Sequence, residues 1–160
     1  MSDVADQLKQ RTMRFALDAC ALIRELPQFE PGPTVKRQLA KASTGVAFNY
    51  RNYCRARSHT EFTARMGVVA DEADESLGWL EFVEASEMGT GPEVSRLLGE
   101  ADELAAIFSA SFGTARYKEQ NKRRPAAESP NQSTNRINSQ SITQSPDHPI
   151  TRSHRLPNRR

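Results

Sequence analysis

The reversal of the chain on which the architecture depends lies at residues 46–66, VAFNYRNYCRARSHTEFTARM. Up to Tyr53, the residues of a mostly apolar stripe, or seam, recur every three or four positions, which is typical of one face of an amphipathic helix. Ser58 and Glu61 then form a capping box, in which the serine side chain accepts from the Glu61 amide and the glutamate reaches back. The pattern predicts that one helix ends and another begins within a few residues.

The same helical period covers the rest of the first 120 residues. It predicts helices over about 3–26, 34–57 and 58–88, and a fourth that opens at residues 90–93, Thr-Gly-Pro-Glu. No alternating run of β-branched residues competes with this pattern. Short connections place successive helices antiparallel, so residues 1–120 are predicted to form an all-α, up-down-up-down antiparallel four-helix bundle.

The composition changes near residue 121. Residues 1–120 hold 14 basic and 18 acidic side chains, whereas residues 121–160 hold eight basic and two acidic ones. Five of the nine prolines and no aromatic residue lie in this second part. Such a segment cannot bury enough apolar surface to offset its ordering entropy. We therefore predict a disordered basic tail over residues 121–160.

The sequence also bears on location. No apolar run approaches the roughly 18 residues of a membrane span, and acidic side chains stand at the N-terminus where a signal peptide is basic and then apolar. Cys20 and Cys54 stand alone in apolar helical stretches, which favours reduced thiols. These features predict a cytoplasmic protein with no membrane partner.

Motifs of the common catalytic and metal sites are lacking. The three histidines are His59, His148 and His154, and none follows a glutamate by three residues, as a di-metal bundle site requires. The sequence has no phosphate-binding glycine loop, no HExxH and no serine nucleophile elbow. We therefore expect no enzymatic activity, no catalytic residues, no metal and no cofactor.

Charge is unevenly distributed along the chain. Residues 33–60 hold six basic side chains and no acid, while residues 61–103 hold twelve acids and only two arginines. Folding back about Ser58 pairs positions whose numbers sum to about 116, which places Lys41 near Glu75, Arg37 near Trp79, and Thr44 near Glu72. Ion pairs between the second and third helices are expected, with a cation–π contact at Trp79.

The predicted topology gathers basic side chains at the end of the bundle that carries the Ser58 turn. The start of the first helix adds Lys9, Arg11 and Arg14 there. The candidate nucleic-acid-binding residues are Arg51, Arg55, Arg57, Arg65, Arg116, Lys118, Lys122, Arg123 and Arg124. One interpretation is that these are solvated helix ends, favoured by the helix dipole. The other is an anion-binding surface for a nucleic-acid backbone.

Five further residues are structural or interface candidates. Asn49 lies on the seam of the second helix and is interpreted as a buried polar group that fixes register or subunit geometry. Glu72 and Glu75 are interpreted as partners of the basic helix rather than as a carboxylate pair for catalysis. Trp79 and Phe82 suggest a second apolar face, which serves either core packing or a subunit interface.

Several segments resemble a known family. They are residues 38–51 (QLAKASTGVAFNYR), 54–58 (CRARS) and 72–81 (EADESLGWLE). They resemble the bacterial four-helix bundle proteins related to those encoded by 23S rRNA intervening sequences, over roughly residues 11–117. Many members carry an acid and a glycine after the helix-two asparagine, where this chain has Arg51-Asn52-Tyr53. The resemblance implies a ring-shaped homopentamer. A similar fold serves as an accessory protein of diversity-generating retroelements, whose partners are a reverse transcriptase and nucleic acid.

Two hypotheses follow. The leading one is a non-enzymatic, self-assembling bundle that acts as an assembly or adaptor module and contacts RNA or DNA through its basic end. The alternative is a purely structural protein–protein interaction module without nucleic-acid binding.

Overall fold

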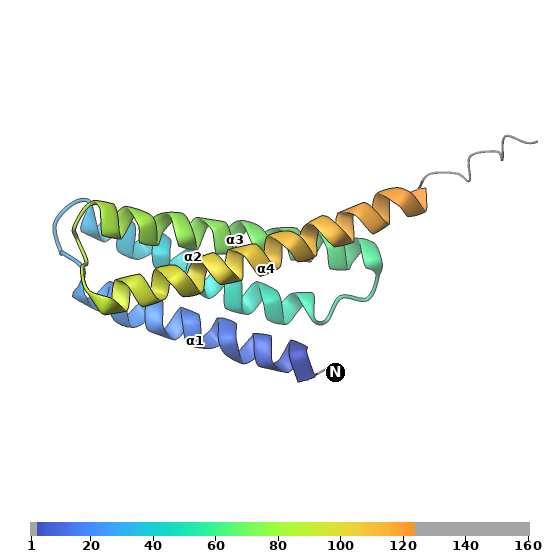
Figure 1. Cartoon of the computed structure of the whole chain (residues 1–160), viewed down its shortest axis with the longest axis horizontal. Coiled ribbons are helices and arrows are strands. Elements are labelled where there is room, and N and C mark those ends of the chain that lie inside the picture. The colour runs from blue at the N-terminus through green and yellow to red at the C-terminus, as the bar shows by residue number, and fades with distance from the viewer. Residues whose placement is uncertain (1–2, 124–160) are drawn as a thin grey trace, which may run out of the picture. The chain divides into compact units, whose positions relative to one another are not determined.

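The protein is a four-helix bundle, seen here in a computed structural model that describes residues 3–123. The helices are α1 (Asp3–Glu25), α2 (Gly32–Tyr53), α3 (His59–Ala85) and α4 (Pro92–Arg123). Connections of five or six residues join them. Each helix therefore runs antiparallel to the one before it, and α4 returns to lie beside α1 (Figure 1). The predicted fold class is confirmed.

One face of each helix is buried in a shared apolar core. The largest fully buried side chains include Phe15 of α1, Leu39 of α2, Met66 of α3 and Phe108 of α4. Buried small polar residues in this seam hydrogen-bond to their own helix, so they need no partner elsewhere. Ser43, for example, donates to the carbonyl of Leu39 over 2.7 Å.

Asn49 is not the buried polar group of the seam. Its side chain is only half-buried, and Tyr50 occupies the core position in that turn. The buried hydroxyl of α2 belongs to Ser43, one and a half turns earlier. The heptad spacing predicted the buried face of α2 correctly but the wrong polar residue on it. The apolar stripe shifts by one residue at Val46 and Ala47, which are both buried.

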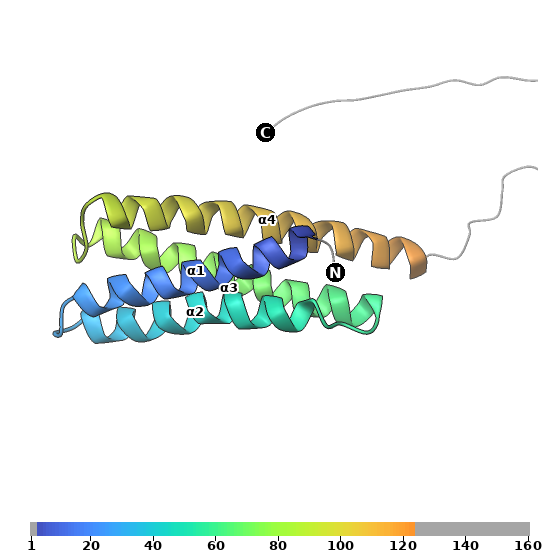
Figure 2. The same ribbon diagram turned by 90° about the horizontal axis from the view of Figure 1, so that it is seen from below.

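Two glycines make the turns at the far end of the bundle possible. A Cβ on Gly32 would lie 2.1 Å from the carbonyl oxygen of Pro27, so only glycine fits where α2 begins. Gly91 precedes α4 with φ of 108°, a conformation that side chains disfavour. Gly32 is the first residue of α2 and Gly91 the last residue of the α3–α4 connection, so both lie at the end of the bundle opposite the α2–α3 turn (Figures 1 and 2).

The helix ends agree with the predicted ones to within three residues, except at the end of α2, while the extension of α4 alters the predicted tail. Helix α2 ends at Tyr53 rather than Arg57, since the amides of Arg55 and Ala56 turn back to Asn52 and Tyr53 at 3.0 Å. No glycine or proline signals this end. Helix α4 continues through residues 121–123, which were expected to be disordered. The rest of the predicted tail, residues 124–160, lies outside the described residues.

Candidate functional site

The α2–α3 turn is held by hydrogen bonds from both sides. The side chain of Ser58 accepts from the amide of Glu61 over 3.1 Å, as the capping box predicts. The carboxylate of Glu61 reaches back one residue further than predicted and accepts from the amide of Arg57 over 2.7 Å. That hydrogen bond, more than the neighbouring guanidinium groups, holds the pKa of Glu61 below its usual range.

Arg65 fastens α3 to the end of α2. Its guanidinium donates to the carboxylate of Glu61, one turn earlier on α3, and to the backbone carbonyl of Asn52 on α2. The half-buried side chain is thus engaged on both sides. Arg65 belongs to the predicted basic group, but the structure gives it a positioning role at the turn.

Three arginines of the turn, in contrast, form no ion pair within the described part of the chain. Arg51, Arg55 and Arg57 are all exposed. A hollow of about 250 Å³ brings Arg51 and Arg55 together with Lys9 of α1. A second one, of about 370 Å³, brings Arg55 and Arg57 beside Glu61 and Arg65. The turn therefore presents a continuous cationic surface.

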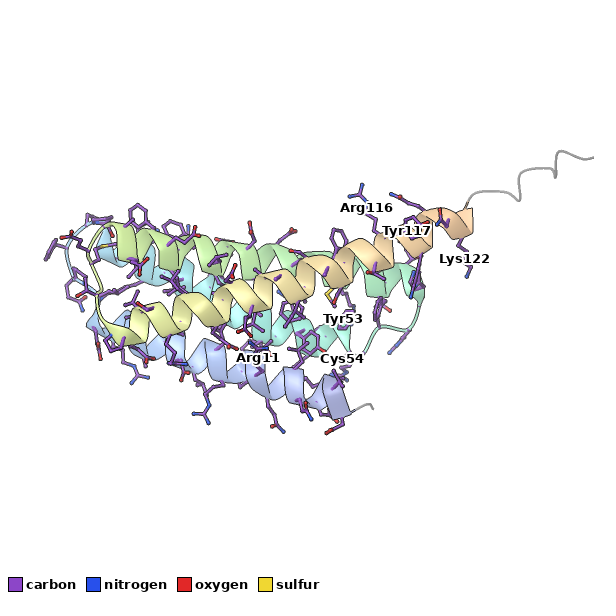
Figure 3. The ribbon with its side chains drawn as sticks, in the orientation of Figure 1. Arg11, Tyr53, Cys54, Arg116, Tyr117 and Lys122 are labelled. Atoms are coloured by element: carbon purple, nitrogen blue, oxygen red, sulfur yellow. The ribbon has the colours of Figure 1, made fainter. Side chains whose placement is uncertain are left out.

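The end of α4 adjoins this turn. Thr60 donates to the carboxylate of Glu119 over 3.0 Å, and the ring nitrogen Nε2 of His59 lies 3.3 Å from the carbonyl oxygen of Ala115. Figure 3 shows Arg116 and Lys122 on the last turns of α4, at the same end of the bundle as the α2–α3 connection.

Arg116, Lys118 and Lys122 are exposed and lack an ion pair among the described residues. Arg123 ends the helix, and Arg124 lies outside the described residues. We name Arg51, Arg55, Arg57, Arg116, Lys118 and Lys122 the basic end.

Arg11 does not belong to the basic end, although it was counted toward it. Its guanidinium donates to both carboxylate oxygens of Glu100 on α4, over 2.7 and 2.9 Å, and also to Glu103. The hydrogen bonds to Glu100 raise the pKa of Arg11 well above its ordinary value. This arginine therefore ties α1 to α4. Lys9 likewise pairs with Asp6 over 3.0 Å.

The predicted pairing of α2 with α3 is observed at one of its contacts. Lys41 and Glu75 form an ion pair over 3.6 Å. Glu72 faces Gly45, one residue beyond the predicted Thr44, and its buried Oε2 atom has no hydrogen-bond partner. Burial raises the pKa of Glu72, while Lys41 acts in the opposite direction. Both glutamates therefore lie along the seam as structural neighbours of α2.

Trp79 is turned along α3 rather than toward Arg37. Its indole N–H donates to Glu75 over 3.4 Å, and its ring packs edge-on against Phe82, with centroids 6.0 Å apart. Phe82 is 43% exposed. The expected cation–π contact is absent from the described residues, and the two rings form a partly exposed apolar face.

An aromatic hollow beside the basic end was not predicted from the sequence. Tyr53, His59 and Phe62 line a space of about 580 Å³ together with α4 residues that include Ala115 and Lys118. Burial, with a smaller contribution from the Cys54 thiol, raises the pKa of Tyr53 to about 12. The apolar period identified Tyr53 and Phe62 as core residues. Only the tight turn reveals that they meet His59 at the surface.

Residues 3–123 contain neither a metal site nor a membrane-spanning helix. No group of three or more histidine, cysteine, aspartate or glutamate side chains is placed to hold a metal ion within this range. None of the four described helices combines the length and the apolar character needed to cross a membrane.

No protein-family model matches the sequence, and no curated protein matches it. Among solved structures, the chain is similar to a protein of unknown function from the S23 ribosomal protein family of Bacteroides thetaiotaomicron. The TM-score is 0.59 at 20% sequence identity, and the match covers 65% of this chain and 96% of that chain. This chain shares its fold with that protein. The neighbour's family is consistent with the resemblance noted in the sequence.

Proposed function

We propose that this chain is a non-enzymatic, cytoplasmic, self-assembling adaptor whose basic end contacts the backbone of RNA or DNA. The observation that carries the proposal is that exposed basic side chains without an ion pair among the described residues gather at one end of the bundle. Arg11, Arg65 and Arg96 are engaged by carboxylates, whereas those of the basic end are exposed and unpaired within residues 3–123. The fold does not need the second group, which suits a phosphate-bearing partner.

The helix dipole accounts for only part of this charge. Its field falls off within the last helical turn. Arg51 lies in the last turn of α2, but α2 ends at Tyr53, so Arg57 stands four residues beyond it. A solvated helix end is thus a weaker explanation for Arg57 than the sequence suggested.

Self-assembly is supported by apolar side chains that the single chain leaves exposed. Phe48 of α2 and Val68 of α3 are 56% and 46% exposed, and each lines a hollow that also contains Asn52. Exposed apolar surface of this kind is typical of interfaces. A ring-shaped homopentamer, implied by the sequence resemblance, would bring five basic ends together and strengthen binding to one nucleic acid.

The test compares two charge-matched triple variants by fluorescence anisotropy with labelled single-stranded RNA and duplex DNA. The first is R51A/R55A/R57A at the turn, and the second is R24A/K36A/R37A at the opposite end. Each arginine that neutralises a phosphate contributes about 0.7 to 0.9 to the logarithmic salt slope. The first variant should weaken binding to every sequence and lower the slope by about 2 for the single strand and nearly 3 for the duplex, while the second should change little.

Two results would count against the proposal. One is no binding of the wild type at about 50 mM salt, where backbone contacts are strongest. The other is equal weakening by both triple variants, since net charge rather than the basic end would then be responsible. Analytical ultracentrifugation tests the assembly separately, and a monomer at tens of micromolar protein would contradict the ring.

A second candidate, the purely structural protein-binding module, is favoured by one observation. Trp79 and the exposed Phe82 lie near the C-terminal end of α3, away from the basic end. If nucleic acid does not bind, this apolar face is the surface to test for a protein partner.

A further inference from the structure

The aromatic hollow beside the basic end has walls suited to a flat ring. Side chains from three elements line it: Tyr53 ends α2, His59 and Phe62 begin α3, and Ala110 and Thr114 belong to α4. Its volume, about 580 Å³, is within the range of about 300–1,000 Å³ found for small-ligand sites. Ser111 and Thr114 add hydroxyl groups to walls that are otherwise mainly apolar.

The rings continue inward from this hollow as a connected series. The His59 and Phe62 planes are inclined by only 16°, with centroids 6.0 Å apart. Phe62 lies 4.4 Å from Tyr53, which stacks on Tyr50 at 5.4 Å. Tyr50 in turn packs against the buried Phe108. The inner rings thus fix the outer ones, and His59 is the exposed end of the series.

Cations stand beside the outer rings. Lys118 lines the hollow itself. A shallower depression of about 340 Å³, which also contains His59 and Phe62, includes Arg57. Of the nearby carboxylates, Glu61 accepts from Arg57 and Arg65, and Glu119 accepts from the Thr60 hydroxyl. A ring that entered the hollow would have Lys118 in the wall and Arg57 in the adjoining depression.

We infer that this hollow accepts an unstacked base of a single-stranded nucleic acid, with the adjoining phosphates at Lys118 and Arg57. The inference rests on the proposed function and specifies its ligand. Aromatic faces next to a cationic track are the usual means of binding single strands without reading sequence. A duplex keeps its bases stacked inside, so it can reach the basic end but not the hollow. An apolar peptide would use the rings but not the flanking cations.

The experiment uses the full chain and fluorescence anisotropy with four labelled probes. They are a single strand of about 15 nucleotides, as RNA and as DNA, the same strand with abasic sites in place of its bases, and a duplex of equal length. The wild type should bind the base-bearing strands about tenfold or more tightly than the abasic one. RNA and DNA strands that behave alike indicate base stacking without sugar recognition.

Two variants test the hollow, and one serves as control. H59A removes the exposed ring, and A110L fills the hollow from α4 without adding charge or an aromatic face. Both should reduce the preference for base-bearing strands while leaving abasic binding within about twofold. F29A removes an exposed aromatic side chain from the α1–α2 connection at the opposite end and should retain the full preference. Circular dichroism confirms folding in each case.

The outcomes separate this inference from the function on which it rests. Equal binding of base-bearing and abasic strands by the wild type, or an unchanged preference in both H59A and A110L, overturns the hollow as a base site. The basic end still stands in that case, provided that binding remains salt-dependent. Failure of the wild type to bind any probe overturns both.

Discussion

The contact of Arg11 with Glu100 allows a quantitative test of how the bundle is closed. This bidentate pair joins the first helix to the last, with side chains 33% and 25% exposed. Exposed ion pairs contribute about 0.2–1 kcal/mol, while breaking fully buried ones costs about 3–5 kcal/mol. For a bidentate pair of intermediate burial we expect a coupling free energy of about 1–2 kcal/mol. Glu103 adds little, because its side chain is 67% exposed.

The assay is a double-mutant cycle of R11M, E100Q and the double variant, by urea unfolding followed with circular dichroism. Methionine keeps the apolar stem of Arg11, so the cycle isolates the charged contact. All four proteins are compared at one concentration, since self-association would raise apparent stability. R14M is the matched control, because Arg14 is an exposed α1 arginine with no ion pair in the described region. Its unfolding free energy should change by less than about 0.5 kcal/mol.

A coupling below about 0.3 kcal/mol would refute the reasoning, because that is the level at which independent sites add. The two groups would then be held in place by helix packing alone. High salt offers a further check: the coupling should survive it in part, since a half-buried pair is screened less than an exposed one.

Three other substitutions have expected outcomes. E72Q should stabilise the protein at neutral pH, because burial raises the pKa of Glu72 and its buried oxygen lacks a partner. The wild type should lose stability as pH rises from the ordinary glutamate pKa through the raised folded-state pKa, and E72Q should lose less across that window, as pH-dependent urea titrations would show. G78A should raise the melting temperature by the equivalent of about 0.5–1 kcal/mol, since the added Cβ meets open space on an exposed helical position. A lower melting temperature in G78A would place that surface in a subunit contact. S58A should cost about 1 kcal/mol in urea unfolding by removing the acceptor for the Glu61 amide. An unchanged midpoint would mean that water replaces the cap.

The fold could be predicted because its signals are local and repeated. Phe15, Leu39, Met66 and Leu97 each belong to a stripe whose period allows only a helix, and all are fully buried. Ser58 marks the start of α3 because a serine side chain readily accepts a hydrogen bond from an amide in the first turn of a helix. The end of α2 carried no such signal, because Arg55 and Ala56 close it with backbone hydrogen bonds that any residue can form.

The candidate site could be predicted only as a distribution of charge. The up-down topology alone brings the α2–α3 turn to the C-terminal end of α4. The sequence therefore predicted that Arg55 and Arg116 lie at the same end of the bundle. The partner of an individual side chain does not follow from the topology. Arg11 and Arg65 were counted among the basic side chains at the α2–α3 end of the bundle, yet the structure places each in an ion pair with a carboxylate. The aromatic hollow was missed for the same reason, since the side chains that line it come from three separate helices.

The difference between arginines that form ion pairs and arginines that do not suggests a function for the basic end. Arg51 lies in the last turn of α2 and Arg55 follows two residues after the helix ends, so two like charges lie close together and repel each other. Neither forms an ion pair in the part of the chain described here, and both line the same hollow. Stability would favour replacing one of them with a glutamate, as happens where Arg96 follows Glu93 on α4. Charges that work against the fold and face solvent are best explained by a partner that neutralises them. The aromatic rings beside them restrict which partner that is.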